Sequence, residues 1–186
     1  MRKVIYSMGV SLDGFIADRD GQIDWGIPDE ELMRFHNEQT REIGALAWGR
    51  LLYEAMLYWE TPEQAGWDPL EREFARTLQA IPKVVFSTTL ADVQGNARLA
   101  GSDVAGEIAK LKAGPDENVV SAGGARLAAT LAELDLIDEY RLFVSPVALG
   151  GGAAFFPPLR KRIALELIET RTFGSGVVYS RYQRVR

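Results

Sequence analysis

One segment of the sequence decides the fold: Asn118-Val119-Val120-Ser121-Ala122-Gly123-Gly124-Ala125. It places a short apolar strand directly before two glycines, and a helical pattern follows over residues 125–134. A strand, a glycine turn and a helix in this order are typical of one β–α unit of a parallel sheet. The start of such a helix presents free backbone N–H groups and the positive end of the helix dipole, which together favour an anion.

Two further strands that precede that segment also run through small or polar residues into a helix or a turn. Trp48-Gly49-Arg50-Leu51 joins a short strand over residues 45–48 to a helix, and Ser87-Thr88-Thr89 ends a strand over residues 83–87. Because ligands of open α/β sheets bind beyond the carboxyl ends of the strands, all three turns can face one dinucleotide. Each turn alone also has an ordinary interpretation: loop geometry for the glycines, a surface cation for Arg50, and a helix cap for the hydroxyls.

The remaining elements complete an α/β pattern. Further strands are expected over residues 4–10, 139–148, 163–173 and 177–185, and further helices over residues 29–44, 50–58, 69–79 and 101–112. Strands and helices alternate up to residue 134, which predicts a mostly parallel central sheet flanked by helices. The turn Gly174-Ser175-Gly176 predicts a C-terminal antiparallel hairpin. We expect one domain over residues 1–186.

Composition excludes several classes of function. The chain has 47% hydrophobic and 25% charged residues, which is typical of a globular protein. Its net charge of −5 argues against nucleic acid as the main partner. It contains no cysteine, so disulfides, thiolate metal sites and a cysteine nucleophile are excluded. A single histidine, His36, cannot form a multi-histidine metal site, and we expect it to be a solvated helix residue.

A membrane segment is not expected. The longest uncharged run, residues 142–159, contains three glycines (150–152) and prolines 146, 157 and 158, which are unsuited to a lipid-exposed helix. The N-terminal apolar stretch is interrupted at Asp13, so it does not match a signal peptide. Together with the absence of cysteine, this suits a cytoplasmic protein.

The order of the motifs resembles a known fold family, although the Rossmann and Walker fingerprints are absent. The motifs that resemble the dihydrofolate reductase fold are Trp25-Gly26-Ile27-Pro28, Gly49-Arg50-Leu51-Leu52-Tyr53-Glu54, Phe86-Ser87-Thr88-Thr89, Ala122-Gly123-Gly124-Ala125 and Pro146-Val147-Ala148-Leu149-Gly150-Gly151-Gly152. More closely, Ser11-Leu12-Asp13-Gly14-Phe15-Ile16-Ala17 and the late Pro-Val-x-Leu-Gly-x-Gly pattern resemble the reductase domain of the bifunctional riboflavin-biosynthesis deaminase–reductase, in its stand-alone form.

The resemblance implies an NADPH-dependent reductase that forms a homodimer. Gly49, Arg50 and Leu51 would hold the cofactor phosphates, with Arg50 near the 2′-phosphate. Ser87, Thr88 and Thr89 would flank the adenosine end. Gly123, Gly124, Ala125 and Arg126 would lie under the pyrophosphate, where a side chain would obstruct it.

Hydride transfer to an imine-like carbon also needs a proton, which a carboxylic acid can supply. The candidates are Asp13, in its Ser-Leu-Asp-Gly turn, and an acid at the start of the helix after Trp25. If the position of this acid is counted from Trp25, it falls on Glu30. If it is counted back from Phe35, it falls on Glu31. Both positions also have an ordinary explanation, because acids favour the first turn of a helix and Asp before Gly is common in turns.

Aromatic residues are candidates for the substrate site. Trp25, Trp59 and Tyr53 can wall a ring-binding cleft or fill the edge of the core. A loop over residues 18–26 can close over the substrate. The acids Asp29-Glu30-Glu31 would repel a phosphate, which weakens the case for a phosphoribosyl substrate.

These observations predict an NADPH-dependent reductase of a pteridine- or pyrimidine-like heterocycle or its ribosylamino derivative. One alternative is a reductase of another small imine or carbonyl. A second, from another class, is a nucleotide-binding module without turnover.

Overall fold

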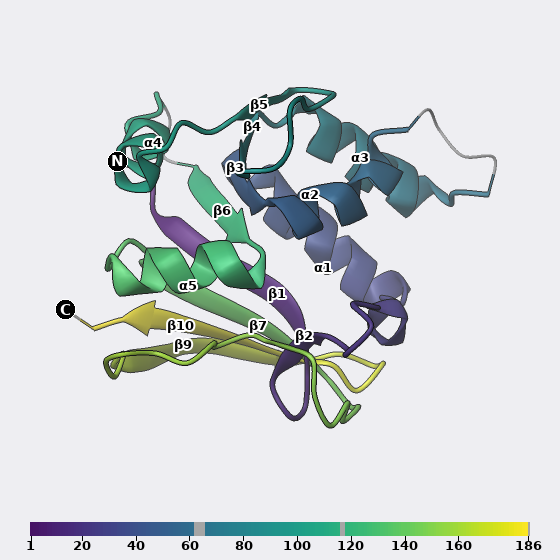
Figure 1. Cartoon of the computed structure of the whole chain (residues 1–186). Helices are drawn as coiled ribbons and strands as arrows, with labels where there is room; N and C mark the ends of the chain where they lie inside the picture. The colour runs from purple at the N-terminus through teal and green to yellow at the C-terminus, as the bar shows by residue number, and fades with distance from the viewer. Residues whose placement is uncertain (62–65, 116–117, 186) are drawn as a thin grey trace.

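The computed structural model describes residues 1–61, 66–115 and 118–185. An eight-stranded sheet forms its centre, in the order β5-β4-β3-β6-β1-β7-β10-β9 (Figure 1). Its strands are β1 (Val4–Ser11), β3 (Ile43–Gly49), β4 (Lys83–Phe86), β5 (Ala97–Leu99), β6 (Val119–Gly123), β7 (Glu139–Ser145), β9 (Leu165–Thr172) and β10 (Val178–Arg184). β10 pairs antiparallel with β7 and β9, and the other pairs of this sheet are parallel. The predicted α/β fold, with a mostly parallel sheet and a C-terminal antiparallel hairpin, is therefore confirmed.

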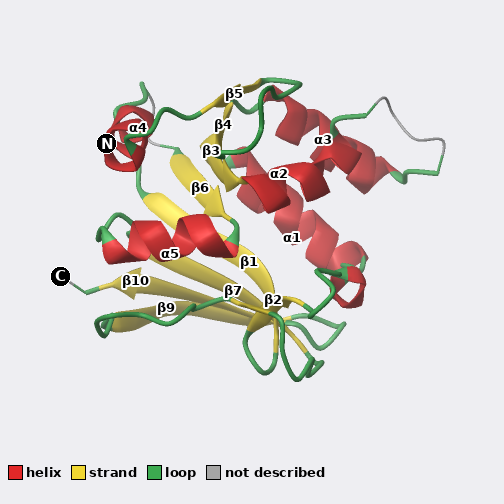
Figure 2. Ribbon diagram, in the orientation of Figure 1, coloured by secondary structure: helices red, strands yellow, loops and turns green. Residues whose placement is uncertain are grey.

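Helices cover both faces of this sheet (Figure 2). They are α1 (Glu30–Arg41), α2 (Arg50–Met56), α3 (Pro69–Ala80), α4 (Val104–Lys112) and α5 (Ala125–Glu133), with short 3-10 turns at Asp24–Gly26 and Leu57–Trp59. None of the helices in the described ranges is long and apolar enough to cross a membrane.

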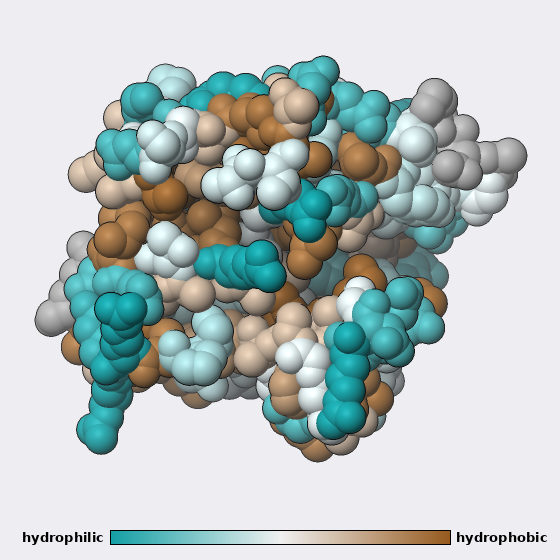
Figure 3. Space-filling model, viewed as in Figure 1, coloured by the Kyte–Doolittle hydropathy of each residue, from teal (hydrophilic) through white to brown (hydrophobic). Residues whose placement is uncertain are grey.

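The two faces of the sheet have separate cores. On one face, α4 and α5 pack against alternate residues of the central strands, among them Tyr6, Ala47 and Ala122. Figure 1 shows α5 in front of this face, and Figure 3 shows that polar and apolar side chains are interspersed on the surface there. On the other face, α1 packs on β7 and β10, and α2 and α3 pack on β3 and β4. This second face therefore has two apolar clusters with the central strands β6 and β1 between them.

Element boundaries differ from the sequence prediction in a few places. The helix expected over residues 29–44 ends at Arg41, because Ile43 already pairs with Val119 at the start of β3. The strand expected over residues 139–148 ends at Ser145. The small sheet of β2 (Phe15–Ala17) and β8 (Ala153–Ala154) was not anticipated, because segments of this length carry no clear periodicity.

The expectation that His36 is a solvated residue is wrong. Its side chain is half-buried, and its ring lies 4.5 Å from the ring of Phe143, measured between centroids. The charged residues Arg34 and Glu38 lie close to it in sequence, but residue 36 is on the side of α1 that contacts the sheet.

A buried lysine fastens α3 to the edge of the sheet. The Lys83 ammonium group, at the start of β4, donates to the carbonyl oxygens of Leu78 and Ile81 at 2.7 and 3.0 Å. It also lies 2.9 Å from a carboxylate oxygen of Glu60, and the exposed fractions of the two side chains are 0% and 9%. Such a buried ion pair affects stability mainly because removal of one partner leaves the other charge buried and unpaired.

We predict that Lys83→Ala lowers the free energy of unfolding by about 3–5 kcal/mol, because Glu60 is then left charged and buried. Urea denaturation measures this change. The matched control is Arg34→Gln, which removes the exposed Glu30–Arg34 pair and costs less than about 1 kcal/mol. Equal losses for the two variants would contradict the role given to Lys83.

Candidate functional site

Three turns predicted from the sequence meet at one edge of the sheet. Gly49, the last residue of β3, pairs in register with Phe86, the last residue of β4. On the other side of β3, Trp48 pairs with Gly123, the last residue of β6. The carboxyl ends of three neighbouring parallel strands are thus level with one another. The ten residues predicted to hold the cofactor lie at these ends or directly after them: Gly49, Arg50, Leu51, Ser87, Thr88, Thr89, Gly123, Gly124, Ala125 and Arg126.

Glycine suits the positions where two of these turns meet. A Cβ atom on Gly123 would overlap Cδ2 of Leu52, the third residue of α2. Gly124 has a φ of +95°, and a Cβ atom there would lie 3.5 Å from both the backbone nitrogen and Cα of Gly49. Glycine is the residue that adopts this backbone conformation at little cost. The backbones at the starts of α2 and α5 therefore approach each other closely.

These two helices also differ from the others in how they begin. An aspartate side chain accepts a backbone N–H at the start of α1, α3 and α4, from Asp29, Asp68 and Asp103 respectively. In contrast, α2 begins at Gly49 and α5 at Gly124, and neither has a hydrogen bond from a capping side chain. Their first N–H groups are left without a side-chain acceptor, so they can bind an anion there.

The polar side chains around this edge are mostly exposed. Arg50 is about half exposed and lies 3.8 Å from Glu54, a long distance for an ion pair. Leu51 is 64% exposed, and Arg126 is exposed. The Ser87 hydroxyl accepts from the backbone N–H groups of residues 89 and 90, so it shapes its own turn. The side chain of Arg50 is therefore available to a ligand, whereas the hydroxyl of Ser87 is partly occupied.

Next to these turns, the central strand β1 has an open strip, which we define as Ser7 and Gly9. Gly9 is exposed although its strand lies in the middle of the sheet, and a Cβ atom there would meet nothing within 4 Å. Ser7 is half-exposed on the same face. Residue 7 follows Tyr6, which pairs with Ala122, so it lies level with Gly123. The strip thus adjoins the glycine turn at the end of β6, where a flat ring can rest on the sheet.

Two of the aromatic residues predicted for the substrate site, Tyr53 and Trp59, pack within the fold. Tyr53 is buried in the core formed by α2, α3 and β3, and its hydroxyl accepts from the backbone N–H of Gln94 at 2.8 Å. Trp59 packs in an aromatic group with the rings of Tyr58, Trp67 and Phe74. These positions give Tyr53 and Trp59 structural contacts. Sequence patterns do not distinguish a ring in the core from a ring at its edge.

Trp25 lies in the short 3-10 turn between β2 and α1, where its indole N–H is 3.3 Å from the carbonyl of Gln22. The segment before it is fastened to the turn after β7, because the Arg19 guanidinium donates to the Gly150 carbonyl at 2.8 Å. Trp25 is half-buried. Of the three aromatic candidates, it is the one that belongs to the loop over residues 18–26.

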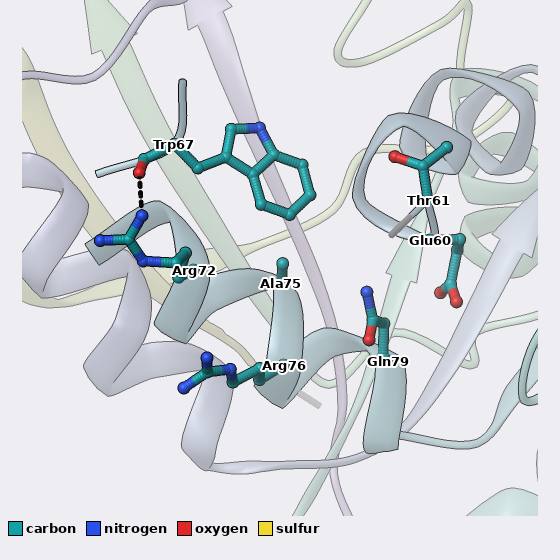
Figure 4. Close-up of a pocket in the computed structure, with 7 residues that line it drawn as sticks. All are labelled: Glu60, Thr61, Trp67, Arg72, Ala75, Arg76 and Gln79. Carbon is teal, nitrogen blue, oxygen red and sulfur yellow. Dashed lines mark hydrogen bonds between the residues drawn. The ribbon is translucent and has the colours of Figure 1, made fainter. Parts of the chain in front are cut away.

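A separate hollow of about 310 Å³ lies beside α3 (Figure 4). Figure 4 shows four of its lining side chains along this helix, with Trp67 on one side and Glu60 and Thr61 on the other. The lining residues are Glu60, Thr61, Trp67, Arg72, Ala75, Arg76 and Gln79. None of the residues predicted to bind cofactor or substrate is among them.

Asp13 holds two distant turns together. Its carboxylate accepts from the Ser11 hydroxyl at 2.6 Å and from the backbone N–H groups of Leu149 and Gly150 at 3.0 and 2.7 Å. These bonds favour the charged form, led by the bond from Ser11, and lower the pKa of Asp13 to about 2. A carboxylate that stays ionised at neutral pH is a poor proton donor. This geometry favours a positioning role for Asp13 over the acid role expected from the sequence.

The acids at the start of α1 are also engaged. Asp29 accepts from the backbone N–H of Leu32, and Glu30 pairs with Arg34 one turn along the helix. Glu31 accepts from Arg171 and from the backbone N–H of Gly174, both at 3.0 Å, so it fastens α1 to the C-terminal hairpin. The bond from Gly174, with that from Arg171, lowers the pKa of Glu31. Of the two acids considered, Glu30 has the more exposed side chain. Glu31 is the one that forms hydrogen bonds to the C-terminal hairpin.

Comparisons with known proteins identify the family of this chain. A family model described as the RibD C-terminal domain matches residues 2–179. The chain belongs to the RibD C-terminal domain family. It is 35% identical over 178 residues to the uncharacterized protein YyaP of Bacillus subtilis, which covers 95% of this chain and 92% of YyaP.

Solved structures of members and neighbours of the RibD C-terminal domain family share the fold. A candidate riboflavin biosynthesis protein from Shewanella sp. PV-4 superposes with a TM-score of 0.76 at 24% identity, over 100% of both chains. The dihydrofolate reductase of Enterococcus faecalis, complexed with NADP(H), superposes with a TM-score of 0.64 at 19% identity, over 99% of this chain and 97% of that chain. These likenesses show the dihydrofolate reductase-like fold expected from the sequence.

We predict that Asp13→Asn lowers the melting temperature at pH 7, because the amide cannot accept the same three hydrogen bonds as an anion. The folded pKa of Asp13 lies below its ordinary value of 3.8. Its stabilising effect is therefore present above that value and is lost as the pH falls towards about 2. Melting curves from pH 7 to pH 2 should show the difference between wild type and variant shrinking below pH 4.

The control for this experiment is Asp20→Asn, which changes an exposed carboxylate in the neighbouring loop. It should leave the melting temperature unchanged across the same range. A difference between wild type and Asp13→Asn that stays constant down to pH 2 would contradict the assigned hydrogen bonds.

Proposed function

We propose that this member of the family is an NADPH-dependent reductase of a pteridine- or pyrimidine-like heterocycle or its ribosylamino derivative. One observation carries the proposal: two helices that begin at closely packed glycines, without capping side chains, lie beside an open strip on the central strand. The first feature suits a dinucleotide and the second suits a flat ring, so cofactor and substrate would lie next to each other.

The residues at the sheet edge fit the cofactor. Gly123 and Gly124 leave the backbone bare where a pyrophosphate would lie, and the first N–H groups of α5 supply donors without a side-chain competitor. Gly49 does the same at the start of α2. Arg50 would bind the 2′-phosphate through its planar charged donor. Thr88 and Thr89, both exposed, would flank the adenosine end.

NADPH supplies a hydride when bound, and the residues of the chain hold the cofactor and the substrate in position. The open strip holds the substrate ring flat against β1, next to the cofactor turn. Asp13, bonded to residues 149 and 150, keeps the turn after β1 joined to the glycine turn after β7. We assign the proton to water at the edge of the bound ring, because Asp13 stays ionised at neutral pH. This route requires no carboxylic acid in the site.

The substrate class is supported by the charge around α1. Glu30 and Glu31 each have an arginine partner, so their negative charge is partly balanced. A ribosylamino substituent that carries a phosphate is therefore less strongly repelled than the sequence alone indicates. The heterocycle and its ribosylamino derivative both stay within the proposal.

We also propose that the protein acts in the cytoplasm as a homodimer. β9 is the last strand of the sheet, and Leu167 and Ile168 on it are 51% and 50% exposed. An edge strand with exposed apolar side chains can pair with another chain. Light scattering of the purified protein tests this, and a monomer at micromolar concentration would overturn it.

The direct test of the function follows the absorbance of NADPH at 340 nm with dihydropterin, dihydrofolate and aminopyrimidine substrates. Oxidation that depends on both enzyme and heterocycle supports the proposal. Binding of NADPH without oxidation of any substrate would favour a nucleotide-binding module. The absence of NADPH binding, seen as no tryptophan quenching or energy transfer, would overturn the proposal.

We predict that Arg50→Ala weakens NADPH about 10- to 100-fold, because a charge-assisted hydrogen bond to the 2′-phosphate is lost. NADH lacks this phosphate, so its dissociation constant should change less than about threefold. Fluorescence titration measures both constants. The matched control is Arg160→Ala, which removes an 87% exposed cation paired with Glu133 at the far end of α5. Equal losses for NADPH and NADH would contradict the assignment.

A further inference from the structure

The position of His36 on α1 directs its side chain to the centre of the sheet. Two sides of α1 are occupied: Leu32 and Phe35 pack on β7 and β10, and Asn37 donates to the Leu70 carbonyl of α3 at 3.1 Å. Successive residues of a helix are rotated by about 100°. Residue 36 therefore falls between these two sides and faces the gap between the two apolar clusters.

Ring contacts place His36 on the side of Phe143 that faces β1. Phe35 covers the outer side, where its ring lies 4.9 Å from that of Tyr179 and 5.3 Å from that of Phe173. In the described part of the chain, the ring of His36 contacts Phe143 and neither of those two. Phe143 pairs in register with Gly9. The imidazole thus lies against the strand neighbour of Gly9, which belongs to the open strip.

The imidazole nitrogens of His36 have no hydrogen-bond partner among the described residues. The nearest charged side chains on β7 are already paired, because Arg141 donates to Glu139 at 2.6 Å and also bonds Gln39. Burial lowers the pKa of His36 to about 4, so the ring is neutral at pH 7. A neutral imidazole offers one donor and one acceptor.

We propose that His36 binds the heterocycle at the open strip and selects rings that carry a neutral amide group. This inference rests on the proposed function and adds the residue that recognises the substrate. An amide of a pterin or uracil ring has an N–H and a carbonyl, which match the acceptor and donor of the imidazole.

The surrounding charges support this choice of ligand. The carboxylates near α1 are engaged elsewhere, with Glu30 on Arg34 and Glu31 on Arg171. Among the described residues, no free carboxylate beside the strip would therefore pair with a protonated ring. A neutral amide would form hydrogen bonds with the imidazole. A site with an unpaired polar group rejects ligands that lack the matching group.

One histidine in the chain makes the test direct. Protein labelled at histidine gives a single Cε1–Hε1 cross-peak, which can be followed by NMR. The probe is 7,8-dihydropterin, added to protein already saturated with NADP⁺. We expect the cross-peak to shift on addition of the pterin, beyond any change that NADP⁺ causes.

Variants give a second, independent measurement. His36→Leu should raise the KM for 7,8-dihydropterin at least about tenfold, with the dissociation constant of NADPH within about twofold of wild type. His36→Gln retains an N–H donor and a carbonyl acceptor, so its KM should lie between those of His36→Leu and wild type. The control is Glu38→Gln, an exposed position on the same helix, which should leave KM unchanged.

The outcomes separate this inference from the proposed function. If wild type reduces 7,8-dihydropterin but the cross-peak does not move, or His36→Leu has the KM of the control, the inference fails and the function stands. If NADPH binds and the pterin does not, the inference fails as well. If NADPH does not bind, both fail. Because the cross-peak is measured on wild type, an unfolded variant does not affect the test.

Discussion

The close approach of two backbone turns is the constraint on which the rest of the site depends. The ends of β3 and β6 are level, Gly124 has a φ of +95° that favours glycine, and a Cβ atom on Gly123 would overlap the side chain of Leu52. Two helices can therefore begin side by side with bare N–H groups directed beyond the sheet. Parallel pairing makes this possible, because it brings the carboxyl ends of consecutive β–α units to one edge.

The acidic side chains of the chain stabilise the scaffold more than they serve the site. Asp29, Asp68 and Asp103 cap helices, Asp13 joins two turns, and Glu31 fastens α1 to the hairpin. The site that we propose consists of backbone N–H groups, exposed hydroxyls, an arginine and a neutral imidazole. Such a site suits an anionic cofactor and an uncharged ring, and it leaves the chemistry to the cofactor.

Much of the fold was predictable, because it depends on local signals. Two strand–turn–helix units, one further strand–turn unit and the final glycine turn predicted the parallel sheet, the hairpin and the meeting of the three turns. Long-range hydrogen bonds were not predictable: the bonds from Leu149 and Gly150 to Asp13 join residues 136 and 137 positions apart. The surroundings of Tyr53 and His36 depend on the neighbouring helix, which composition does not reveal. The choice between Glu30 and Glu31 depends on one residue of helical register, which motif spacing leaves open.

The central claim is that NADPH binds across the ends of β3, β4 and β6, with its nicotinamide beside the open strip of β1. A crystal structure of the protein with NADPH tests this most directly. We predict the pyrophosphate against Gly123 and Gly124, the 2′-phosphate within hydrogen-bond distance of Arg50, and the nicotinamide next to Gly9. A cofactor bound elsewhere, for example in the hollow beside α3, would contradict the account.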